Sequence, residues 1–136
     1  MAIFVATDFS VSINGSTALA SYLTQVELKL SANDVTTTAF GSTFVTRVAG
    51  LKEGSLTLTF NQDYAASTVD ATLFPLLGSN ATVVIKPTSS AVGSANPSYT
   101  TVCLVTDLTP VSGQIGDLST FSVTWPTNGT VTRAVV

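Results

Sequence analysis

The stretch from Leu51 to Phe60 constrains the fold of this chain more than any other. After Gly54, the apolar residues Leu56, Leu58 and Phe60 alternate with serine and threonine. A period of two is typical of a strand with one buried and one solvated face. Threonine suits the solvated face because β-branched residues fit a pleated sheet. We therefore expect a central strand here, with the leucines and the phenylalanine in the core.

Other β-rich segments predict further strands around this one. They cover residues 9–13, 25–30, 35–39, 82–86, 99–107 and 118–125, and residues 130–136 form a last short strand or tail. Val26, Leu28 and Leu30 are expected to point inward from the second strand. Phe121, Val123 and Trp125 make the better core face of the strand over 118–125. Residues 14–15, Asn-Gly, predict a tight turn, and residues 31–34 also read as a turn.

One short helix is expected over about residues 68–77, after a cap at Ser67 or Asp63. Pro75 shortens or kinks it and Gly78 ends it. Its apolar side holds Val69, Leu73, Leu76 and Leu77. The fold class is therefore all-β, a sandwich or barrel with one flanking helix. The chain is short enough for one domain over 1–136, with an N-terminal arm over 1–8 and a C-terminal tail over 130–136.

Few residues are charged, only 10% of the chain against a typical quarter. A nearly uncharged surface favours association, so a subunit of an ordered assembly competes with an ordinary neutral sandwich. The net charge of −3 argues against a nucleic-acid-binding face, which needs a basic stripe. The five basic residues are scattered along the sequence.

The sequence gives little support for a catalytic site. The chain has no histidine, which removes His-based triads and metal clusters. The single cysteine, Cys103, lies in a strand-like run and is expected to be a small buried hydrophobe. Asp107 and Asp117 flank one turn and are the only weak candidates for sharing a cation. We predict a protein that is not an enzyme and needs no cofactor or metal.

The N-terminal residues lack the basic region of a secretory signal, and no apolar run approaches a membrane span. We therefore expect assembly in a reducing cytosol. The segment from 40 to 50 is expected to be a long loop, and long ordered loops are usually functional. Its apolar side chains fold back onto the sandwich or are buried by a neighbouring subunit. The candidate contact residues are Phe40, Phe44, Val45, Arg47 and Val48.

Three blocks of sequence, taken in order, resemble one family. Residues 34–41 (Asp-Val-Thr-Thr-Thr-Ala-Phe-Gly) precede residues 48–60, which contain Gly-Leu-Lys-Glu-Gly and the alternating strand. Near the end stand Gly-Asp at 116–117, the strand to Trp125, and Gly-Thr-Val-Thr-Arg at 129–133. Over residues 23–133 this order is similar to that of the major tail proteins, or tail tube proteins, of long-tailed bacteriophages.

The resemblance implies a virion protein, assembled in the host cytoplasm, that forms stacked and usually hexameric rings. The rings enclose a lumen through which DNA passes, and other tail proteins cap the tube. The expected lumen-facing residues are Glu27, Thr57 and Thr59, on the solvated faces of their strands. Alternatives are a capsid decoration protein, a tail-completion protein, an immunoglobulin-like binding module or, least of all, a small enzyme.

Overall fold

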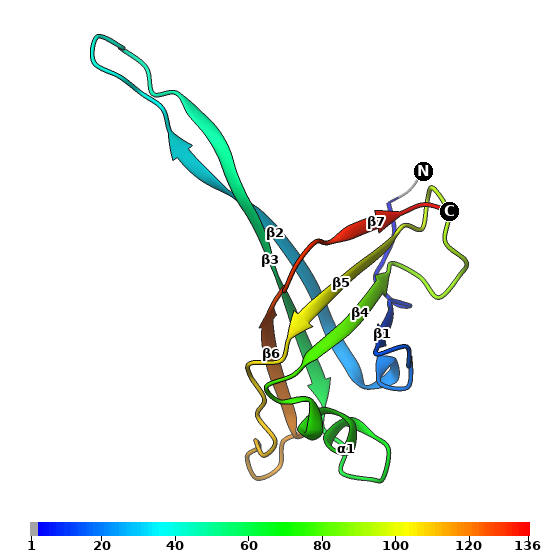
Figure 1. Ribbon diagram of the computed structural model, residues 1–136. Helices are drawn as coiled ribbons and strands as arrows, with labels where there is room; N and C mark the ends of the chain where they lie inside the picture. The colour runs from blue at the N-terminus through cyan, green and yellow to red at the C-terminus, as the bar shows by residue number, and fades with distance from the viewer. Residues whose placement is uncertain (1–2) are drawn as a thin grey trace.

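Two antiparallel sheets enclose the core, and one long hairpin projects beyond them (Figure 1). The computed structural model describes residues 3–136. The strands are β1 (Ser10–Ile13), β2 (Leu23–Thr36), β3 (Arg47–Asn61), β4 (Asn80–Lys86), β5 (Ser98–Leu104), β6 (Thr120–Pro126) and β7 (Thr132–Ala134). The helical residues are α1 (Val69–Leu73), which runs into a 3₁₀ turn (Phe74–Leu76), and a separate 3₁₀ turn (Ala20–Tyr22). The all-β class with one short helix is confirmed.

The order of strands places β3 at the centre of its sheet. One sheet has the order β1-β4-β5-β7 and the other β2-β3-β6. In the second sheet, Leu58 lies opposite Val26 on β2 and Val123 on β6. Because directly opposite residues share a face, this register gathers the apolar residues of three strands on the inner side.

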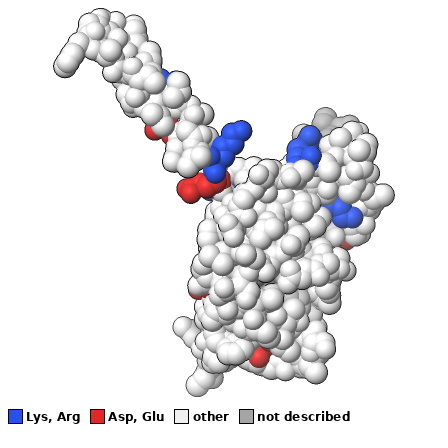
Figure 2. Space-filling model, in the orientation of Figure 1, with Lys and Arg blue, Asp and Glu red and all other residues white. Residues whose placement is uncertain are grey.

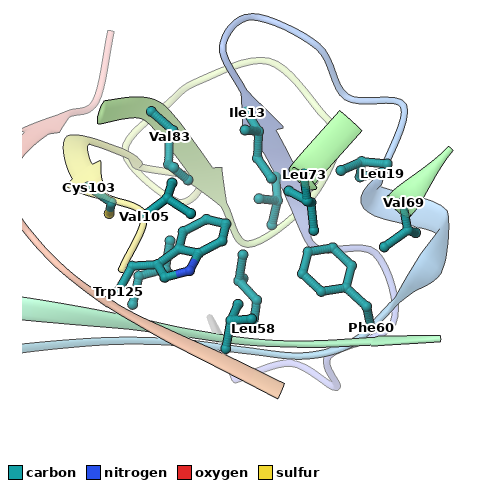
Figure 3. Packing of buried hydrophobic residues seen from close by; sticks show 14 of the residues in the cluster. Ile13, Leu19, Leu58, Phe60, Val69, Leu73, Val83, Cys103, Val105 and Trp125 are labelled. Atoms are coloured by element: carbon teal, nitrogen blue, oxygen red, sulfur yellow. The ribbon is translucent and has the colours of Figure 1, made fainter. Parts of the chain in front are cut away.

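The core confirms the faces predicted for the two alternating strands (Figure 3). Leu56, Leu58 and Phe60 are fully buried, and so is Trp125. Phe60 stacks on Phe121 with ring centroids 5.3 Å apart. The indole N–H of Trp125 donates a hydrogen bond of 2.9 Å to the carbonyl oxygen of Asp107. A buried tryptophan needs such a partner, so this bond fixes the chain after β5 against β6.

The helix is shorter than predicted. Its first turn follows Thr68, which makes no side-chain capping bond, so the caps expected at Ser67 and Asp63 are not formed. Val69 and Leu73 are fully buried, whereas Leu77 is exposed and lies beyond the helical residues. Gly78 has a φ of +85°, a conformation that glycine adopts without strain. The predicted stop at this residue is therefore confirmed.

The predictions for the segment from 31 to 50 were wrong. Residues 31–34 do not turn, because β2 continues to Thr36. Residues 35–39 are not a short partner strand, and β3 already begins at Arg47. The connecting loop thus covers residues 37–46 rather than 40–50. It is the end of one long β2–β3 hairpin, and Leu30, expected inside, is exposed where the hairpin leaves the body.

Gly54 marks that point of departure. Its N–H donates to Oγ1 of Thr127 (3.1 Å), and its carbonyl accepts from the N–H of Thr127 (2.9 Å). A Cβ at this position would lie 2.8 Å from Cδ2 of Leu30 and 3.1 Å from the carbonyl oxygen of Lys29. Close backbone approach is a common reason for glycine inside a strand.

We expect Gly54→Ala to lower the free energy of unfolding by about 1–3 kcal/mol, the usual cost of overpacking. Urea denaturation of both proteins measures the difference. Gly93→Ala is the matched control, because a Cβ there meets nothing within 4 Å. Equal stability of the Gly54 variant and the wild type would show that a side chain fits between β3 and Leu30 at this position.

Candidate assembly surface

The outer half of the hairpin, residues 31–53, is called the arm here. It extends away from the body as a narrow projection (Figures 1 and 2). Every residue of the arm is exposed. Six residues of β2 lie in it, from Ser31 to Thr36, and they span about 20 Å at roughly 3.3 Å per residue. The arm therefore has two strands and no core of its own.

Local hydrogen bonds shape the loop at the end of the arm. Ser42 N–H donates to the carbonyl of Ala39 (3.3 Å), and Gly41 has a φ of +91°. This is the geometry of a type II turn, which requires a positive φ at its third residue. Below it, Thr37 and Thr46 are joined by a backbone bond of 2.8 Å and a hydroxyl contact of 2.8 Å. This loop, residues 37–46, is called the tip here, and its hydrogen bonds give it a defined structure.

Apolar side chains cover the arm. Val35 and Val48 lie directly opposite each other across the two strands. Phe40 occupies the second position of the turn and is fully exposed. The exposed large apolar residues of the arm are Val35, Phe40, Phe44, Val45, Val48 and Leu51. The alternative in which Phe44, Val45 and Val48 fold back onto the sandwich is wrong, because the arm carries them away from it.

The charged residues of the arm leave its tip neutral. No charged residue lies between Asp34 and Arg47. These two form an ion pair, with Nε of Arg47 2.8 Å from Oδ2 of Asp34. Both side chains are more than half exposed, so the pair adds little stability. Arg47 is therefore paired within its own hairpin, below an uncharged tip.

The candidate lumen residues lie together on the outer face of the β2-β3-β6 sheet. Glu27 is opposite Thr57, which is opposite Thr124 on β6. The hydroxyls of Thr57 and Thr124 are 3.2 Å apart, and those of Thr59 and Ser122 are 2.9 Å apart. The face is polar, and its β2 strand carries one acidic and one basic side chain, Glu27 and Lys29, the latter opposite Ser55. The strands at its two edges, β2 and β6, each pair only with β3 in the described part of the chain.

An open groove of about 680 Å³ lies in the angle between the arm and the body. The arm contributes Ala32 and Lys52, and the segment after β6 contributes Thr127 and Val131. The groove contains one basic and one acidic side chain, Lys52 and Glu53, at neighbouring positions. It brings no set of catalytic groups together.

The residues considered for chemistry are dispersed. Cys103 is fully buried, as predicted, and burial raises the pKa of its thiol to about 11. A thiol with so high a pKa is a poor nucleophile near neutral pH. Among residues 3–136, no group of three or more His, Cys, Asp or Glu side chains is placed to hold a metal ion, and Asp107 and Asp117 belong to no such group.

The sequence pointed to four of the apolar residues that are exposed on the arm, Phe40, Phe44, Val45 and Val48, but not to Val35 and Leu51. A hairpin centred near Gly41 would have placed Val35 opposite Val48, since the two valines stand at nearly equal distances from this glycine in the sequence. The turn predicted at residues 31–34 was incompatible with such a hairpin.

No protein-family model matches the chain, and no match is found among curated proteins. In residues 3–136, none of the helices has the length and apolar character that a membrane crossing requires.

Proposed function

We propose that this protein is a structural subunit that assembles into stacked rings, and specifically the tail tube protein of a long-tailed bacteriophage. The observation that carries the proposal is the arm, a two-stranded hairpin exposed along its whole length. An isolated hairpin is marginally stable in water, and large exposed apolar patches mark interaction sites. Burial of the arm by neighbouring subunits provides the missing partner.

The outer sheet face supports the same proposal. A channel for DNA works best when its wall does not bind phosphate. The row of Glu27, Thr57 and Thr124 offers hydroxyls and a carboxylate. The free edges of β2 and β6 offer unpaired backbone groups, which pair readily with another chain. Lateral pairing at these edges would close a ring with this polar face toward the lumen.

Negative-stain electron microscopy of the purified protein tests the proposal directly. We expect rings, or tubes with a central channel, at micromolar protein concentration. A protein that stays monomeric in sedimentation at all concentrations reached in solution would contradict it. The order of the sequence blocks quoted above favours the tail tube over a capsid decoration protein, and tubes rather than single rings would distinguish the two.

The assembled protein should bind duplex DNA weakly, with a dissociation constant above about 1 μM at physiological salt, because its proposed lumen face lacks a basic stripe. Fluorescence anisotropy with a labelled duplex measures this. A variant with Glu27→Lys and Thr57→Lys places two cations on that face and should bind more tightly, with a steeper dependence on salt. Submicromolar binding by the wild type would contradict the proposed lumen.

A further inference from the structure

Two Asn-Gly pairs are exposed on the surface of the molecule, at residues 14–15 and 128–129. In such a pair, the deprotonated backbone nitrogen of the glycine is a nucleophile for the side-chain carbonyl carbon of the asparagine. Glycine has no Cβ to shield this nitrogen. The attack also requires the asparagine side chain and the peptide that follows it to rotate toward each other. The surroundings of each pair therefore decide whether it reacts.

The first pair is locked in the tight turn after β1. Ile13 and Ser16 exchange two backbone hydrogen bonds across the turn, of 2.9 and 3.1 Å. Asn14 and Gly15 both have the positive φ that such a turn requires. Thr82 on β4 holds Asn14 in two ways: its N–H donates to Oδ1 of Asn14 (2.9 Å), and its carbonyl accepts from the N–H of Asn14 (2.7 Å). Rotation at Asn14 therefore breaks several hydrogen bonds.

The second pair lies in the segment that crosses from β6 in one sheet to β7 in the other (Figure 1). The backbone before the pair is anchored, because the N–H of Asn128 donates to the carbonyl of Val102 (2.7 Å). Within the described part of the chain, residues 129–131 form no backbone hydrogen bond. A Cβ placed on Gly129 would meet nothing within 4 Å. The peptide after Asn128 is therefore free to rotate.

The side chain of Asn128 is also held loosely. Its amide nitrogen donates to Oδ1 of Asn80 (3.1 Å), and Asn80 is itself exposed. The partner is thus another surface side chain, which moves more easily than the strand backbone that holds Asn14. The side-chain carbonyl of Asn128 is open to the nitrogen of Gly129.

We propose that Asn128 is a site of spontaneous deamidation and that the fold protects Asn14 from the same reaction. The nitrogen of Gly129 forms a bond to Cγ of Asn128, and the bond from Cγ to Nδ2 breaks. The proton lost by Gly129 leaves with the amide group as ammonia, and a five-membered succinimide remains. Water then opens the ring at either carbonyl, which gives aspartate or isoaspartate. Each event adds one negative charge to the net charge of −3.

Incubation of the purified protein at mildly alkaline pH, followed by mass spectrometry of its proteolytic peptides, tests this proposal. We expect the mass increase of an amide-to-acid exchange to accumulate about tenfold faster at Asn128 than at Asn14, because the hydrogen bonds of the turn must open before Asn14 reacts. The reaction should be slower at mildly acidic pH, where less of the backbone nitrogen is deprotonated. Isoelectric focusing should show a new acidic band that grows with time.

The chain unfolded in guanidinium chloride is the matched control, because both pairs are then free to rotate. There the two asparagines should react at similar rates. Equal rates in the folded protein would overturn the proposal, and so would an Asn128 that keeps its amide in the folded protein while it reacts in the unfolded chain. In Asn128→Ser, an exposed substitution, the acidic band should be absent. Its persistence in that variant would place the reaction at another residue and also overturn the proposal.

Discussion

Leu58→Asp is expected to abolish folding. Leu58 is fully buried at the centre of β3, opposite Val26 and Val123. The buried hydrophobic cluster around it contains no lysine or arginine to pair with a carboxylate. An unpaired buried charge costs several kcal/mol, and the lost leucine burial adds about 1.5–3 kcal/mol. A domain stability of about 5–15 kcal/mol does not reliably survive both losses. The far-UV circular dichroism of the soluble fraction measures the result.

Thr57→Asp is the matched control, one residue away on the same strand. Thr57 faces outward, where its hydroxyl meets that of Thr124. A carboxylate there stays solvated. It faces Glu27 across the two strands, but a cross-strand pair of this kind changes stability by only about 0.2–1 kcal/mol, so this variant should still fold. The opposite outcome, a folded Leu58→Asp and an unfolded Thr57→Asp, would mean that the two faces of β3 are reversed.

The parts of the fold that could be predicted are those whose side chains alternate between core and solvent. In β3 and β6 the buried face selects large apolar residues, and the outer face selects serine and threonine. The period of two in these strands is therefore visible in the sequence. The turn at Asn14 and Gly15 was also recognisable, since both residues have a positive φ (52° and 84°), as a tight hairpin of this kind requires.

The arm was not predictable in the same way, for a physical reason. Nothing in the described structure packs against either of its faces, so no core imposes a period of two. Apolar and polar residues in the arm are then free of the alternation that a core imposes. A one-residue irregularity between Ala32 and Asp34 shifts the register with β3, and such a bulge interrupts alternation further. The apolar candidates were found, whereas the long strands that carry them were not.

The second large effect is expected at the arm. In the monomer, the side chains of Phe44, Val45 and Val48 are exposed. Their replacement by serine should change the free energy of unfolding by no more than about 0.5 kcal/mol. In a stack, each fully buried side chain contributes about 1.5–3 kcal/mol, so each tip contact loses several kcal/mol. In the proposed stack, one ring engages the next through several copies at once, so these free-energy losses add across the interface.

We therefore expect the variant with Phe44→Ser, Val45→Ser and Val48→Ser, called the tip variant here, to retain rings, which depend on lateral contacts, and to form no tubes at any concentration reached by the wild type. Electron microscopy and sedimentation velocity distinguish the two. The matched control replaces Ile3, Phe4 and Val5 with serine. It also removes one phenylalanine and two aliphatic residues from exposed positions, but outside the arm. Tubes from the tip variant, together with their loss in this control, would place the stacking contact at the N-terminal segment instead of the arm.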